Sequence, residues 1–151
     1  MGQLRLSLSL AILTTYLVFL ASCARPPQES ASSQEASDSA RVAAIPAADT
    51  AKYRTMKDMR AWQNPYLIIR ADGVGVLDSA NHVQRLIKPE ELPQTLAKLP
   101  ASSWPYGRVV AVAENAMTVS ADDKIKMRKN RALVAGTLES MQVLINWVPS
   151  A

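Results

Sequence analysis

The sequence predicts an α+β fold, a two-layer sandwich in which a small mixed β-sheet carries two helices on one face. Short runs rich in β-branched residues alternate with runs whose apolar residues recur at helical spacing. Their order is a β-hairpin, a helix, a strand, a second helix and a last strand. A strand–helix–strand crossover favours parallel pairing, and about 85 residues suffice for one such domain. We therefore expect a single small domain over residues 65–151.

The domain starts with "PYLIIRADGVGVLD" (65–78), which predicts a β-hairpin. Residues 66–69 form a β-prone run, and Val74 begins a second short strand. Between them, Asp72 and Gly73 are turn residues, because glycine accepts positive φ angles. The residues that follow, "DSANHVQ" (78–84), have the polar composition of a loop.

A helix is predicted next, because Leu92, Leu96 and Leu99 share one helical face. Pro89 and Pro93 are tolerated only near a helix start, so we expect a tight turn at Pro89 and a regular helix from about Pro93.

The clearest strand is "GRVVAVAEN" (107–115), whose apolar residues on both faces indicate a central position. The helix "DDKIKMRKNRALVAGTLESM" (122–141) comes after it, and Ser120 with Asp123 resembles a capping box at its start. Two lines of apolar residues along this helix predict a broad buried face: Ile125, Ala132 and Ala135, and Val134, Leu138 and Met141. "QVLINWVPS" (142–150) supplies the last strand, which Pro149 ends.

An amphipathic helix is predicted over residues 51–64, before the domain. Tyr53, Met56, Met59 and Trp62 recur every three residues, and cations occupy the other faces. This helix either packs on the domain or lies in a membrane interface. Residues 24–50 are rich in Ala, Ser, Gln and Pro and contain no aromatic residue, which predicts a disordered tether; a partly helical linker is the alternative.

The first 22 residues have the layout of a secretory signal. Arg5 provides the positive start, residues 6–20 are an apolar run, and small residues follow. This 15-residue run, apolar apart from Ser and Thr, is short for a membrane span, which needs about 20 residues.

"LASC" (20–23) resembles the lipobox of bacterial lipoproteins. The resemblance implies that the sulfur of Cys23 carries a diacylglycerol and that the signal is cut between Ser22 and Cys23. Ala24 after the cysteine resembles the outer-membrane sorting class if the source is Gram-negative. An ordinary cut after Ala24 is the alternative and would remove the chain's only thiol. With Cys23 acylated, we expect no disulfide and a protein anchored in the cell envelope, facing the periplasm.

The order "ADGVGVLD", "PEELPQTLAKL", "RVVAVAEN", "AGTLESM" and "QVLINWVP" resembles the periplasmic domain of the ExbD/TolR family, whose members belong to ion-driven envelope motors. The resemblance covers roughly residues 65–150 and implies the fold and binding of an envelope partner. Motor function is not carried over, because the family's transmembrane helix has an essential Asp and this leader has no acidic residue.

"RKNRALVAGTLESM" also resembles the peptidoglycan-binding helix of OmpA-like domains. In that family an Arg, here Arg131, pairs with an Asp after the preceding strand to hold a peptidoglycan carboxylate. Glu114 and Asn115 stand near the place of that Asp. Arg131 is thus either a cell-wall contact or a solvated helix charge.

The sequence favours a non-enzymatic binding protein over an enzyme. It has a single histidine, His82, no second imidazole for a metal pair and no phosphate-binding glycine loop. A small hydrolase using His82 with Asp78 and Ser79 is the remaining enzymatic alternative, and its activity would disappear in His82→Ala. Trp104, in "SSWPYG", is a candidate contact for a partner or glycan, or a core residue. We expect no cofactor apart from the lipid on Cys23, no metal and no nucleic-acid partner.

Overall fold

A computed structural model of the full chain describes residues 28–56, 58–79, 83–115, 117 and 120–149. The chain divides into two compact units, residues 1–32 and 33–151. Along the described residues run helix α2 (Gln28–Ala43), strands β1 (Tyr66–Arg70), β2 (Gly73–Asp78) and β3 (Val83–Ile87), helix α3 (Leu92–Ala97), strand β4 (Val109–Glu114), helix α4 (Ala121–Ser140) and strand β5 (Leu144–Trp147). Short 3-10 turns lie at Thr50–Lys52, Met59–Ala61, Pro89–Glu91 and Ala101–Ser103.

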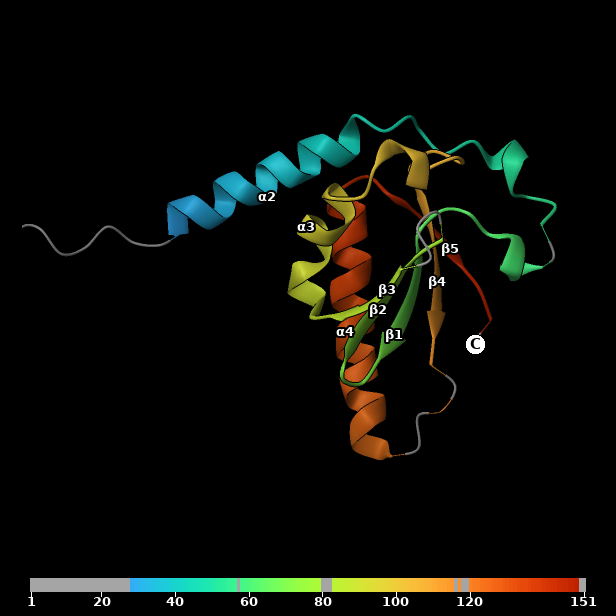
Figure 1. The fold of residues 1–151 in the computed structure, drawn as a ribbon. Helices are drawn as coiled ribbons and strands as arrows, with labels where there is room; N and C mark the ends of the chain where they lie inside the picture. Colours follow the sequence, from blue (N-terminus) through green and yellow to red (C-terminus); the bar gives the residue numbers. More distant parts are fainter. Residues whose placement is uncertain (1–27, 57, 80–82, 116, 118–119, 150–151) are drawn as a thin grey trace, which may run out of the picture. The chain divides into compact units, whose positions relative to one another are not determined.

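The five strands form one mixed sheet in the order β3-β2-β1-β4-β5 (Figure 1). The β1–β2 and β2–β3 pairs are antiparallel, whereas β1–β4 and β4–β5 are parallel. The predicted α+β class with a mixed sheet is confirmed, including the hairpin at its start and the central place of β4.

Strand β3 was not predicted, because residues 78–84 were interpreted as a loop. It pairs with β2 from Val74↔Ile87 to Asp78↔Val83. All of its residues are exposed or half-buried, since it forms an edge of the sheet. A strand that buries so little does not need alternating apolar residues, so the sequence carries little signal for it.

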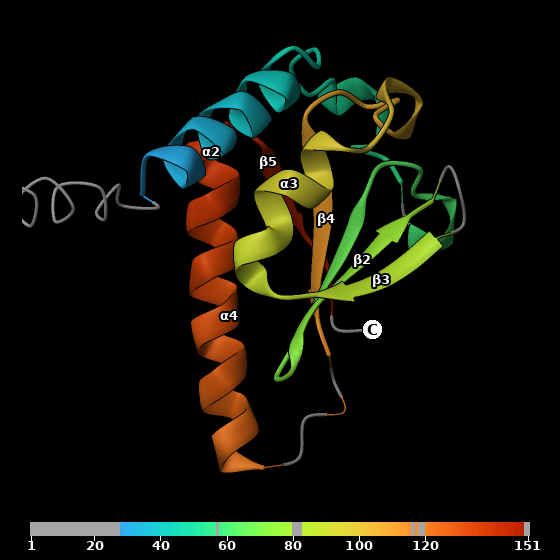
Figure 2. The ribbon, with the colours of Figure 1, turned by 60° about the vertical axis from the view of Figure 1, so that its left-hand side comes forward.

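Helices α3 and α4 pack on the same face of the sheet (Figure 2). Leu96 of α3 and Val134 and Leu138 of α4 are fully buried against apolar residues of β1 and β4. The predicted start of α4 is confirmed, because the Ser120 Oγ accepts a hydrogen bond from the Asp123 N–H at 3.0 Å. The predicted turn at Pro89 precedes α3 as expected.

The opposite face of the sheet is covered near β4 by a second cluster, in which Tyr53, Trp62 and Tyr106 pack with Val109 and Ala111. The predicted helix over residues 51–64 is wrong: two 3-10 turns stand there, capped by Asp49 and Asp58. The ring centroids of Tyr53 and Trp62 lie 5.5 Å apart. On a straight helix nine residues would separate them by about 13 Å, so the segment folds back to bring both rings to the sheet.

The predicted tether is ordered in its described part. Residues 28–43 form α2, which agrees with the alternative of a partly helical linker, and Val42 is fully buried in the main core. The Pro46 carbonyl accepts from the Arg108 N–H at 2.8 Å, and the Asp49 N–H donates to the Tyr106 carbonyl at 2.9 Å. The stretch from Val42 to Asp49 therefore belongs to the folded unit.

Candidate functional site

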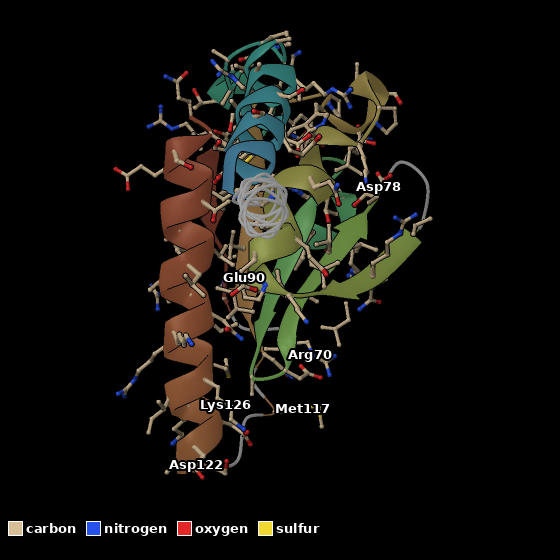
Figure 3. All side chains as sticks on the ribbon, turned by 90° about the vertical axis from the view of Figure 1, so that its left-hand side faces the viewer. Arg70, Asp78, Glu90, Met117, Asp122 and Lys126 are labelled. Atoms are coloured by element: carbon tan, nitrogen blue, oxygen red, sulfur yellow. The ribbon has the colours of Figure 1, made fainter. Side chains whose placement is uncertain are left out.

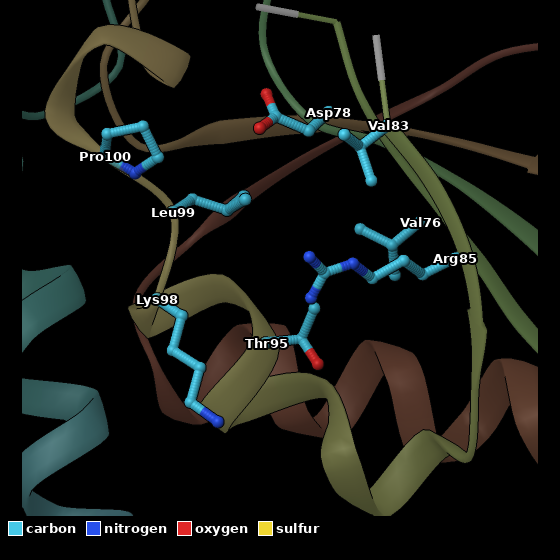
Figure 4. A pocket seen from close by; sticks show the side chains of 8 residues that line it. All are labelled: Val76, Asp78, Val83, Arg85, Thr95, Lys98, Leu99 and Pro100. Atoms are coloured by element: carbon cyan, nitrogen blue, oxygen red, sulfur yellow. The ribbon is translucent and has the colours of Figure 1, made fainter. Parts of the chain in front are cut away.

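A groove of about 450 Å³ opens between β3 and α3 (Figure 4). Residues two apart on a strand point to the same face, so β2 and β3 present matched pairs to the helix side. These pairs are Val76↔Arg85 and Asp78↔Val83. The opposite wall comes from α3 and the turn after it, namely Thr95, Lys98, Leu99 and Pro100.

The groove contains one buried carboxylate. Asp78 is 6 % exposed, and its Oδ1 accepts a hydrogen bond of 2.9 Å from the hydroxyl of the fully buried Ser103. A buried charge is costly unless its acceptors are satisfied, so Ser103 stabilises Asp78 in this position. Because Ser103 ends a 3-10 turn, this hydrogen bond also fixes the turn after α3 to the end of β2.

Two cations stand on facing walls of the groove. Arg85 extends from β3 towards α3, and Lys98 follows the last turn of α3 (Figure 4). Both residues are exposed, and among the residues that the structure describes neither side chain has a hydrogen bond or an ion pair. By contrast Arg70 and Arg131 both have a carboxylate partner. Val83 and Leu99 give the groove an apolar part beside these charges.

Two cations beside an apolar wall suit a ligand that has both an anionic group and an apolar part. A carboxylate entering from solvent would meet two cationic donors, and charge-assisted hydrogen bonds are the stronger kind. Asp78, occupied by Ser103, would discourage a second carboxylate deeper in the groove. Within the described residues, no three His, Cys, Asp or Glu side chains are grouped so as to hold a metal ion.

Arg131 lies on α4, outside this groove, and has partners of its own. Its Nη1 donates to the Glu114 Oε1 at 2.6 Å, and its guanidinium stacks 4.4 Å from the centroid of the Trp147 ring. Glu114 ends β4 and Trp147 ends β5, so three elements meet here. Arg131 is thus paired with a carboxylate of the chain itself, Glu114, which stands near the place where OmpA-like domains have an Asp.

Trp104 is a core residue in this structure. It is 4 % exposed and packs in the main cluster, beside a smaller hollow of about 220 Å³ that it lines together with Ile45 and Leu96. Its indole N–H has no hydrogen-bond partner among the described residues. The sequence also suggested Trp104 as a contact for a partner or glycan, but little of its ring is exposed for such a contact.

The remaining predicted site residues, Ser22, Cys23, Ala24 and His82, lie outside the described residues. Asp78 and Ser79 are described, and Asp78 is engaged with Ser103. Arg85 and Lys98 were missed by the sequence analysis. Arg85 was missed because its strand was not predicted, and Lys98 because nothing in the sequence indicates that α3 and β3 are neighbours.

Comparisons with protein-family models, with curated proteins and with solved structures find no match to this chain. Among the helices that the structure describes, none has the length and apolar character needed to cross a bilayer.

Proposed function

We propose that this chain is a lipid-anchored, non-enzymatic protein of the bacterial cell envelope whose folded unit binds a partner protein. The proposed binding site is the groove between β3 and α3, and the proposed ligand is a partner segment that carries a carboxylate. The observation that carries this proposal is the presence of two cations, Arg85 and Lys98, on facing walls without an acidic partner among the described residues.

The anchoring part of the proposal rests on the sequence of the leader. An apolar run ends in "LASC", and two or three acyl chains on Cys23 would give firm attachment, since each buried CH₂ contributes about 0.8 kcal/mol. Ala24 favours the outer membrane if the source is Gram-negative. Intact-mass measurement of the mature protein is expected to show an acylated N-terminal Cys23. A mature chain that starts elsewhere would contradict the anchoring.

Protein binding is supported by the position of the groove at the edge of the sheet. Strand β3 is an edge strand of the described sheet, and its exposed Val83 lines the groove together with Arg85. Complementary charges raise the association rate and select the partner, while apolar contacts at Val83 and Leu99 would slow dissociation.

The binding site is tested by photo-cross-linking in cells. A photoreactive amino acid at Val83, which is exposed and lines the groove, is expected to capture a protein that mass spectrometry identifies. The double variant Arg85→Glu/Lys98→Glu should reduce this product at least about tenfold, because like charges now face the partner's carboxylate. The matched variant Arg54→Glu/Arg60→Glu, on the 50–61 segment, makes the same charge change and should leave the product unchanged. Capture that is insensitive to the groove variant would refute the site.

Peptidoglycan binding is the second candidate, favoured by the contact between Arg131 and Glu114. It predicts that purified sacculi retain the protein and that Arg131→Ala abolishes retention. The neighbouring exposed cation provides the control, since Arg128→Ala should retain binding. Loss in both variants would indicate general charge attraction without a specific carboxylate site.

A further inference from the structure

The first half of α4 is the most basic part of the folded unit. Lys124, Lys126, Arg128 and Lys129 lie within six residues, and all four are exposed. Among the described residues, none of the four side chains has an ion pair. Asp122 and Asp123 at the helix start lower the excess of this stretch to two positive charges.

The core does not account for this part of the helix. The first buried residue of α4 is Met127, so the helix runs through its initial turns without packing on the sheet. Figures 1 and 2 show this end of α4 extending past the β1–β2 turn. Ser120 and the acidic first turn stabilise the projecting end locally, as caps do.

An apolar strip accompanies the cations on the outer face. Ile125 and Ala132 lie seven residues apart on one helical face, with Lys129 between them, opposite to the buried residues of α4, namely Met127, Val134 and Leu138. Ile125 is 63 % exposed and Leu133, two turns on, is 38 % exposed. The strip therefore leaves apolar surface in water, and the lysine and arginine stems beside it are apolar as well.

The charged residues near this end of α4 do not neutralise its positive charge. Arg70, at the β1–β2 turn near this end (Figure 3), is paired with Asp72 at 2.9 Å, and the guanidinium holds the pKa of the Asp72 carboxyl below its ordinary value. Arg131 is likewise paired with Glu114. Both pairs are neutral overall, which leaves the excess of two positive charges at the start of α4 uncompensated by these neighbours.

We propose that the outer face of α4, from Lys124 to Leu133, docks on an anionic lipid surface. The helix would lie along the surface with Ile125 and Leu133 in the headgroup–acyl boundary, and the four cations would contact lipid phosphates. The apolar strip favours lipid over a hydrophilic polyanion, which would contact the cations and leave Ile125 in water. This surface does not involve the β3–α3 groove, so the inference is independent of the proposed function.

The test places a fluorescent probe in the protein while the chain is attached to vesicles. Ala132→Cys is labelled with an environment-sensitive dye in a full chain whose Cys23 is acylated or replaced by Ser. Vesicles of phosphatidylcholine alone are compared with vesicles containing about a third phosphatidylglycerol. The leader or the lipid anchor attaches the chain to both kinds of vesicle, so a difference in dye emission between the two reports contact of the α4 surface with anionic lipid. A blue shift is expected only with the anionic lipid, and about 1 M salt should abolish it, because screening shortens the Debye length to about 3 Å.

Variants distinguish the contribution of the cations from that of the exposed apolar residues. Lys126→Glu/Lys129→Glu should raise the anionic lipid needed for half of the shift at least about tenfold. Ile125→Ser should weaken the shift while leaving its salt dependence. Two controls accompany these variants. The shift should not change in Arg54→Glu/Arg60→Glu, and a dye at Ser102→Cys should show no shift. An equal shift on neutral vesicles, or the same shift with soluble polyphosphate, would overturn the proposal.

Discussion

At the scale of single residues, Asn64 joins two parts of the chain through one buried side chain. It is fully buried, and its Nδ2 donates to the carbonyls of Gly107 and Val109, each at 2.7 Å. Its Oδ1 accepts from the Tyr106 N–H at 2.9 Å. One side chain therefore satisfies three backbone groups and joins the entry of β1 to the entry of β4. From the sequence, Asn64 was only the last residue of the helix predicted over residues 51–64.

Asn64→Ala is expected to destabilise the fold by about 2–4 kcal/mol, because it leaves buried backbone groups without partners. Urea unfolding should show a lower midpoint with an unchanged m-value. The exposed neighbour supplies the control, and Gln63→Ala should change stability by less than about 0.5 kcal/mol. Equal effects at both positions would show that the hydrogen bonds of Asn64 contribute little.

At the scale of elements, Gly107 determines how residues 46–47, which precede the 3-10 turn at Thr50–Lys52, pack on the sheet. Its φ of 77° lies in the left-handed region, and a Cβ would overlap the carbonyl oxygen of Ala47. The neighbouring Arg108 N–H donates to Pro46. Close backbone approach thus holds residues 46–47 against the start of β4. At Gly136, within α4, an added Cβ would meet none of the described neighbouring atoms within 4 Å.

The two glycines provide a matched pair of substitutions. Gly107→Ala should cost at least about 2 kcal/mol, from backbone strain and the displaced segment. Gly136→Ala should instead raise stability by about 0.5–1 kcal/mol, because alanine loses less entropy in a helix. Thermal unfolding by circular dichroism measures both changes. A harmless Gly107→Ala would mean that residues 46–47 are held by other contacts.

Prediction from sequence succeeded for elements whose packing repeats along the chain. Leu92 and Leu96 of α3, Val134 and Leu138 of α4 and the valines of β4 are buried as their spacing indicated. The same spacing placed Ile125 and Ala132 on the buried face of α4, which is wrong, because both are exposed. Prediction also failed for residues 51–64, because apolar residues that recur every three positions, from Tyr53 to Trp62, fit a helical face and also fit a folded-back segment. The groove could not be predicted, since Arg85 and Lys98 become neighbours only through the placement of α3 beside the edge strand.

At the scale of the whole folded unit, the sheet is covered on both faces by different means. Helices α3 and α4 cover one face, where Trp104 packs. The irregular segment that contains Trp62 covers part of the other. Trp147, on the edge strand β5, is 43 % exposed. The three tryptophans of the chain thus report on three separate environments.

Fluorescence quenching by acrylamide checks this arrangement. Trp147→Phe should remove most of the quenchable emission, because Trp62 and Trp104 are 3 % and 4 % exposed. Trp62→Phe and Trp104→Phe should leave the quenchable part in place and lower the total emission. Strong quenching that persists in Trp147→Phe would show that one of the two covering layers opens to solvent.

The parallel pairing of β1 with β4 also bears on how quickly the unit folds. Tyr66 pairs with Ala111, so the centre of the sheet closes only after β2, β3 and α3 have been looped out between them. Closing a long loop costs entropy before contacts repay it, which slows chains rich in distant pairings. A chain exported before this closure would cross a membrane with its central strands still apart.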